Sequence, residues 1–362
     1  MCMASLTSVS VSARKVIRYG VYAVILILIL RFAFNVSLNL YRRFFPPRQP
    51  EPTLAFGKLP KLALPDRPTP QNIAYTLELP EGNLPTLIEQ AVVYTMPPFQ
   101  SDIEVVDNAK KTAQSLGFRP DGKVIVESIP NVYIFEKSGG LSNLTMNVIT
   151  GVFSISYNIN QNPSVVRDTA STPEAAIEFV RSFLEGAKLL QSDLSDGPAT
   201  HGFLKYEAGK FVPAISQSEA NAIKVNLFRK GYGAKNQDIQ SVTPDMPESN
   251  VWFIVAGRSR QIIAAEYHYF PIDKDKIATY PLKTSEAAFE ELKQGKAFIT
   301  NLPSITGGSV IIRKVYLSYY DAGQYAEYYQ PVIVFEGDNN FYGFVPAVID
   351  EHYGKEQTVN QQ

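Results

Sequence analysis

Three histidines are the residues with the most obvious chemical potential, but their spacing does not favour a metal site. His201, His268 and His352 lie far apart, and none falls in an H-x-x-x-H or H-E-x-x-H pattern. Zinc sites usually draw two ligands from one short motif. His268 lies in the alternating stretch "AAEYHYF", where a half-buried strand residue is the ordinary interpretation.

Two acidic pairs offer oxygen ligands, Asp273 with Asp275 and Glu336 with Asp338. Neither pair belongs to a ligand series of the EF-hand kind, so solvated turn residues are the commoner interpretation. No P-loop, G-x-G-x-x-G or G-x-S-x-G sequence is present. We therefore expect a protein that is not an enzyme and has no metal or cofactor.

A tyrosine-dense stretch near the C-terminus is the sharpest candidate for a binding surface. Alternate residues of a strand point to opposite faces of a sheet, so some of these rings can pack inward and others can contact a protein or glycan partner. Cross-strand aromatic packing is the commoner outcome, and both interpretations stay open. The six residues are Tyr316, Tyr319, Tyr320, Tyr325, Tyr328 and Tyr329.

An apolar run near the N-terminus, "AVILILILRFAF", predicts a single transmembrane helix despite Arg31. A span needs roughly 20 mostly apolar residues. A register over Tyr19 to Leu40 puts Arg31 near the bilayer centre, whereas Val16 to Phe34 leaves it about one turn from an end, where its side chain can reach the headgroups. A cleaved signal peptide is the main alternative, but "RFAFNVS" lacks the small residues of a cleavage site.

Charge and cysteine content bear on the orientation of this helix. Residues 1–50 hold seven Lys and Arg and no acidic residue, although the whole chain has a net charge of -1. The basic residues are evenly divided between the two sides of the run, so they do not decide the orientation. Because Cys2 is the only cysteine, no intrachain disulfide can form, and the thiol-free remainder suits an exported body. The mildly acidic body argues against a nucleic-acid partner.

Residues 46–70 contain 8 of the 25 prolines and predict an extended linker. We expect a cytoplasmic tail at 1–15, a membrane helix and interfacial turn at 16–40, a linker at 41–70, three α+β units at 71–165, 166–275 and 276–352, and a disordered tail at 353–362.

Each expected α+β unit combines one helix with antiparallel strands. Helices are predicted over 101–116, 172–186 and 284–294, with Ser101, Thr172 and Thr284 at their starts. Alternating segments with turns at Thr150-Gly151, at Gly257 and at "GDNN" predict three hairpins. The shared T-x-E-A-A-[I/F]-E sequence of the last two helices suggests an internal repeat.

The C-terminal sequences "EAAFEELKQGKAFI", "VYLSYYDAGQYAEYYQPVIVFEG" and "FYGFVPAV" resemble the closing segment of the YycH/YycI-type regulatory proteins. The matching features are a helix ending at Gly295, a strand over Val315 to Tyr319 and a strand from Pro331 to Phe335. Residues 101–160 are similar in pattern to PepSY-like modules. The resemblance implies a non-enzymatic, membrane-anchored extracytoplasmic protein that regulates a sensor histidine kinase in bacteria.

Two functions are therefore expected, and both place the protein in the cell membrane with its body outside. In the first, the protein binds and regulates another membrane or envelope protein, with Arg31 and the six tyrosines as the interface. In the second, it is an envelope module that binds cell-wall polymer or assembles with copies of itself. The lipid bilayer is a partner in both.

Overall fold

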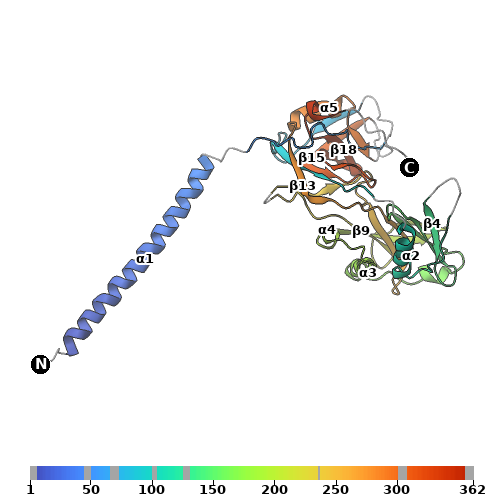
Figure 1. The fold of residues 1–362 in the computed structure, drawn as a ribbon, viewed down its shortest axis with the longest axis horizontal. Helices are drawn as coiled ribbons and strands as arrows, with labels where there is room; N and C mark the ends of the chain where they lie inside the picture. Colours follow the sequence, from blue (N-terminus) through green and yellow to red (C-terminus); the bar gives the residue numbers. More distant parts are fainter. Residues whose placement is uncertain are drawn as a thin grey trace. The chain divides into compact units, whose positions relative to one another are not determined.

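A computed structural model describes residues 6–44, 50–65, 73–99, 104–124, 131–234, 237–300 and 308–354 (Figure 1). The chain divides into two compact units, Met1–Glu51 and Pro52–Gln362. The second unit is an α+β body in which strands predominate.

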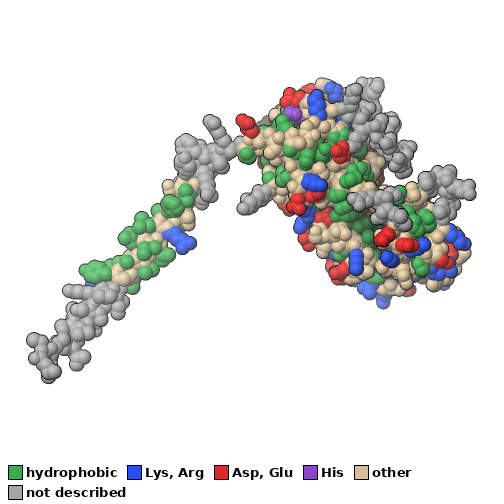
Figure 2. Space-filling model, viewed as in Figure 1, with side chains coloured by type: hydrophobic (Ala, Val, Ile, Leu, Met, Phe, Trp, Pro, Cys, Tyr) green, Lys and Arg blue, Asp and Glu red, His purple; other side chains and the backbone are tan. Residues whose placement is uncertain are grey.

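The first unit is built around the helix α1 (Leu6–Phe44), whose side chains are described from Arg18 to Leu38. That stretch is long and apolar enough to cross a membrane, and none of it is buried within the protein. Figure 2 shows hydrophobic side chains along it. By length and composition it fits a membrane anchor or a signal sequence. It extends four residues beyond the Val16 to Phe34 register favoured from the sequence.

The proline-rich segment differs from the free linker expected over 41–70. Helix α1 continues to Phe44, and the body already begins at Pro52. Leu59 is fully buried, and its backbone N–H donates to the carbonyl of His352 at 2.8 Å. The prolines do prevent a helix, but the apolar residues between them pack into the body: Leu54, Phe56, Leu59, Leu62 and Leu64.

One nine-stranded antiparallel sheet takes all its strands from residues 123–267. Its lateral order is β3-β4-β5-β6-β12-β11-β9-β7-β8. The predicted turns at Gly151 and Gly257 are confirmed, because both glycines have positive φ between paired strands. The strands are β3 (Lys123–Val124), β4 (Val132–Glu136), β5 (Ser142–Asn147), β6 (Phe153–Tyr157), β7 (Ala199–Glu207), β8 (Lys210–Pro213), β9 (Ala222–Leu227), β11 (Val251–Ala256) and β12 (Gln261–Tyr267).

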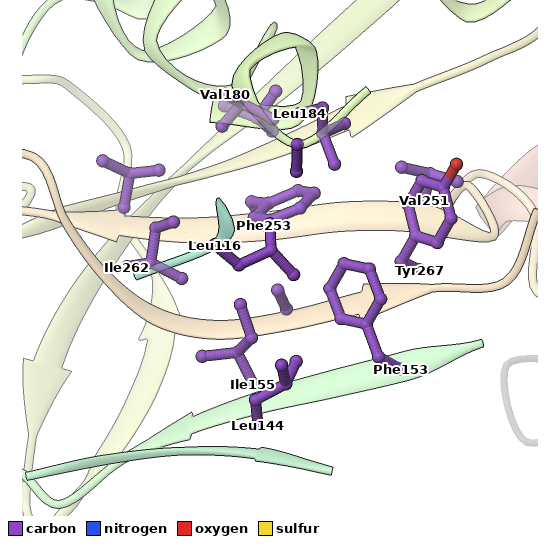
Figure 3. Packing of buried hydrophobic residues seen from close by; sticks show 14 of the residues in the cluster. Leu116, Leu144, Phe153, Ile155, Val180, Leu184, Val251, Phe253, Ile262 and Tyr267 are labelled. Carbon is purple, nitrogen blue, oxygen red and sulfur yellow. The ribbon is translucent and has the colours of Figure 1, made fainter. Parts of the chain in front are cut away.

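Two helices, α2 (Val105–Ser115) and α3 (Pro173–Gly186), share one core with this sheet. In Figure 3, Val180 and Leu184 of α3 lie over Phe253 of β11, and Leu144 and Ile155 lie on neighbouring strands. The predicted start of α3 is confirmed, since the Thr172 hydroxyl accepts the backbone N–H of Ala175 at 3.3 Å. Ser101, the predicted start of α2, lies outside the described residues.

The remaining strands form a six-stranded and a three-stranded sheet. In the larger one, β1 and β10 pair in parallel with the long central strand β15, and the other pairs are antiparallel. Its strands are β1 (Ala74–Leu77), β10 (Ser241–Val242), β14 (Phe298–Thr300), β15 (Ser309–Tyr320), β17 (Pro331–Gly337) and β18 (Phe341–Pro346). The smaller sheet consists of β2 (Gln90–Thr95), β13 (Asp273–Pro281) and β16 (Tyr328–Tyr329).

Two further helices complete the body, the single turn α4 (Ser192–Ser195) and α5 (Ser285–Lys293). The predicted start of α5 is confirmed, because the Thr284 hydroxyl accepts the N–H of Ala287. The "GDNN" turn is also confirmed, as residues 338–340 form a 3-10 turn between β17 and β18.

The expected repeat of one helix on each sheet is not seen in the body. Strands expected in separate first and second units join in one sheet, because β6 pairs with β12. Conversely, β1 and β2 fall within the residues of the expected first unit, but β1 pairs with β15 and β2 pairs with β13. Hairpin signals are local and do not specify which edge strands meet, so the sequence pattern did not reveal this arrangement.

A buried arginine joins the nine-stranded sheet to the C-terminal strands. The side chain of Arg229, which follows β9, is 2 % exposed. Its guanidinium donates to Asp193 of α4, to Asp321 after β15 and to the carbonyl of Phe270, each at 2.7 Å. We call these four residues the arginine cluster. A buried charge needs such partners to offset its desolvation.

Replacing Arg229 with methionine should destabilise the body by about 3–5 kcal/mol, because Asp193 and Asp321 would remain buried without their cation. Equilibrium chemical denaturation measures this change. The matched control is Arg119→Met, since Arg119 is half-exposed and pairs with Glu136 at 2.8 Å on the surface. An equally small effect of both substitutions would contradict the role of the arginine cluster.

Candidate functional site

Three of the six candidate tyrosines lie in the core. Tyr319, Tyr320 and Tyr329 are 0 %, 3 % and 1 % exposed. The rings of Tyr319 and Tyr329 stack with centroids 5.0 Å apart, and the Tyr319 hydroxyl donates to the carbonyl of Val92 at 2.6 Å. For these three residues, cross-strand packing explains the tyrosine-rich sequence.

The other three tyrosines do not gather into one exposed aromatic surface. Tyr316 and Tyr328 are half-buried, and burial raises the pKa of Tyr328 to about 12. Tyr325 is 39 % exposed and contacts Phe99 edge-on, with ring centroids 5.6 Å apart. Tyr325 is therefore the most exposed of the six tyrosines.

The acidic pairs singled out in the sequence have local partners. Asp273 accepts the backbone N–H groups of Asp275 and Lys276, as a turn residue does. Asp338 accepts two hydrogen bonds from Arg313, which lower the pKa of its carboxyl group. Among the described residues, no group of three or more His, Cys, Asp or Glu side chains is placed to hold a metal ion.

A groove of about 460 Å³ lies between α2, the β5–β6 turn and the segment that follows β12. We call it the tyrosine groove, after Tyr267 and Tyr269 in its wall. Exposed amides of Asn108 and Gln191 stand at its side, and its described lining has no charged residue. The remaining lining residues are Phe99, Val105, Ala109, Thr112, Met146, Val148, Ile149, Thr150, Gly151, Leu189 and Pro271.

The wall of the tyrosine groove is held by the arginine cluster. The Tyr269 hydroxyl donates to Asp193 at 2.8 Å, and the Arg229 guanidinium lies 4.1 Å from the centre of the Tyr269 ring. Burial acts to raise the pKa of Asp193, but the charge of Arg229 and the hydrogen bonds from Tyr232 and Tyr269 outweigh it and lower that pKa. Asp193 is therefore a fixed anion behind the groove.

This geometry suits a neutral ligand with one apolar face and several hydroxyl groups, because aromatic and amide side chains line an uncharged hollow. No motif in the sequence pointed to the groove. Its walls come from four separate chain segments, and Tyr267 and Tyr269 looked like ordinary strand residues. No local spacing marks such a site.

His268 lies close to the arginine cluster and connects two segments of the body. Its Nδ1 lies 3.1 Å from the carbonyl oxygen of Gly323, and its Nε2 lies 3.0 Å from a carboxylate oxygen of Glu266. The hydrogen bond with Glu266 is the main reason that the pKa of His268 is raised above 6.5. Its half-buried position agrees with the sequence interpretation, although it lies just after β12.

Comparisons with known proteins give little further guidance. No family model matches the chain, and no curated protein matches it. A crystal structure of an uncharacterized protein from Eubacterium rectale is similar over 71 % of this chain and 82 % of that one, with 10 % identity and a TM-score of 0.29. A likeness at that score supports no argument about function. None of these findings links the chain to the YycH/YycI-type proteins.

The raised pKa of His268 predicts a pH-dependent stability. Protonated His268 stabilises the fold fully below the unfolded pKa of 6.5, and this contribution is lost as the pH rises through the higher folded value. His268→Gln should therefore lower the free energy of unfolding more at about pH 5.5 than at about pH 8.5. Urea denaturation at both pH values measures the difference. The control is His201→Gln, since His201 is exposed on β7. Equal losses for His268→Gln at both pH values would refute the prediction.

Proposed function

We propose that this is a single-pass membrane protein whose extracytoplasmic body and membrane helix bind and regulate another membrane protein. The resemblance of its C-terminal sequences implies a sensor histidine kinase as that partner. In this proposal the protein acts by binding and carries out no catalysis.

The position of Arg31 in the exposed apolar helix is the observation that supports this proposal. The described apolar stretch runs from Arg18 to Leu38, and Arg31 lies inside it, seven residues before Leu38. Its neighbours Leu30 and Phe32 are 59 % and 71 % exposed. A charge at the centre of a membrane helix costs about 2.5–3.5 kcal/mol on the insertion scale, and a partner that pairs with it offsets that cost. An acidic or strongly hydrogen-bonding residue of a second membrane helix is such a partner.

The extracytoplasmic placement of the body is supported by composition. The body contains no cysteine, which suits an oxidising compartment. The basic residues at the two ends of the helix remain balanced, so they favour neither orientation.

Replacing Arg31 with leucine should reduce recovery of the crosslinked partner by about tenfold or more, because an intramembrane charge pair is lost. Photo-crosslinking in intact membranes, followed by purification of the full-length chain, measures this recovery. Arg31→Lys should keep part of it, since the charge remains.

The matched control is Arg18→Gln, at the end of the candidate span, where the headgroups solvate the side chain. Carbonate extraction should show that every variant stays in the membrane. Undiminished partner recovery with Arg31→Leu would overturn the proposed pairing.

The tyrosine groove favours a second function, the binding of a neutral, hydroxyl-rich cell-envelope polymer. Its amides and aromatic rings match sugar hydroxyls and the apolar faces of sugar rings. In this case the membrane helix serves only as an anchor.

For this second function, Asn108→Ala combined with Gln191→Ala should weaken retention of the full-length protein by isolated cell walls by about tenfold, because two hydrogen bonds to the polymer are lost. Sedimentation with purified walls measures the retention. Gln114→Ala is the control, since Gln114 is exposed on α2 but does not line the groove. If the double variant and the control are retained as well as the wild type, the groove does not bind the wall.

A further inference from the structure

A second cavity, of about 210 Å³, lies over the nine-stranded sheet between the end of α2 and the middle of α3. We call it the interhelix cavity. It does not share a lining residue with the tyrosine groove. Its lining comprises Leu116, Phe118, Lys137, Ser142, Ile155, Phe179, Phe183, Ser259, Arg260, Gln261 and Ile262.

Apolar side chains of the core form the floor of the interhelix cavity. Leu116, Ile155 and Ile262 are at most 7 % exposed and belong to the core of the nine-stranded sheet. Figure 3 shows these three side chains gathered near Phe253. Phe179 and Phe183 on α3 are only half-buried and form the wall toward that helix. An aliphatic chain entering here would therefore replace water against hydrocarbon.

The charged residues of the cavity lining are both cations. Lys137 and Arg260 are exposed residues of two turns, after β4 and before β12. The Arg260 guanidinium lies 5.7 Å from the centre of the Phe179 ring, so it stands beside the apolar wall. Within the described residues neither cation forms an ion pair, whereas nearby Arg119 is paired with Glu136.

The backbone of Arg260 has an uncommon conformation for a residue with a Cβ. Arg260 has φ of 56°, in the left-handed region that a residue with a Cβ adopts at a cost. The turn from Gly257 to Arg260 therefore holds a long cationic side chain in a conformation that glycine or asparagine would adopt more easily.

We propose that the interhelix cavity binds a monocarboxylate with an aliphatic chain, as in a fatty acid. The chain occupies the apolar interior, and the carboxylate accepts charge-assisted hydrogen bonds from Arg260 and Lys137. The carboxylate is essential to this assignment. An alcohol of the same chain length would leave both cations unpaired, and an amine would be repelled by them.

The test compares three probes of equal chain length, octanoate, 1-octanol and octylamine, by isothermal titration calorimetry. The full-length protein is held in lipid nanodiscs, and protein-free nanodiscs correct for partition into lipid. Octanoate should bind saturably, and the alcohol and amine should bind at least about tenfold more weakly.

Arg260→Gln and Lys137→Gln should each weaken octanoate binding by about tenfold, because each removes a charge-assisted hydrogen bond. Both residues are exposed, so the fold should persist, and thermal denaturation verifies this. The control is Arg258→Gln, in the same turn as Arg260 but outside the cavity lining, and it should bind like the wild type.

Three outcomes would overturn the proposal. Absence of saturable octanoate binding would make the cavity a packing void. If 1-octanol or octylamine binds as tightly as octanoate, Arg260 and Lys137 do not select for a carboxylate. An equal loss in Arg258→Gln would indicate a general surface-charge effect without a defined site.

Discussion

The charge of Arg229 is the constraint on which the rest of the body depends. A guanidinium cannot be deprotonated and must find acceptors in the protein interior. Here the acceptors come from α4, from the loop after β12 and from the end of β15, so the cation is satisfied only when these three segments meet. The hydrophobic effect has no preferred direction, but three hydrogen bonds of 2.7 Å to one planar group fix both distance and direction. The arginine cluster thus sets how the nine-stranded sheet meets the C-terminal strands.

The same cluster also connects the wall of the tyrosine groove to the aromatic core of the C-terminal strands. Tyr269 lies in the wall of the tyrosine groove and donates a hydrogen bond to Asp193. On the other side, the Tyr329 ring stacks on Tyr319, and its centre lies 6.0 Å from the Arg229 guanidinium. The groove is therefore shaped by residues that cannot move without disturbing a buried charge. The interhelix cavity has a different basis. Its floor is formed by core residues of the nine-stranded sheet beside α2 and α3, and its two cations come from the turns after β4 and before β12.

The sequence predicted local structure well and tertiary pairing poorly. The caps at Thr172 and Thr284 and the turns at Gly151, Gly257 and 337–340 were found because a few adjacent residues determine them. The parallel pairing of Ala74 with Ser309 has no such signal, since the two residues lie 235 positions apart. Tyrosine clustering was visible, but whether a ring points inward depends on which strand lies beside it, so the sequence left both outcomes open, and three of the six rings lie in the core. The arginine cluster was invisible because residues 193, 229 and 321 have ordinary neighbours in the sequence.

The backbone bridge between Leu59 and Tyr353 has a consequence for the order of events in folding. The first strands of the body, β1 and β2, also take their partners from β15, β13 and β16, all encoded in its last third. During synthesis from the N-terminus, β1 and β2 have no partner strands until nearly the whole body has left the ribosome. Their exposed strand edges are then open to mispairing with other chains. The sheets of the body are thus completed only when its last strands have been synthesised. A chaperone that holds the nascent chain until then would limit such mispairing.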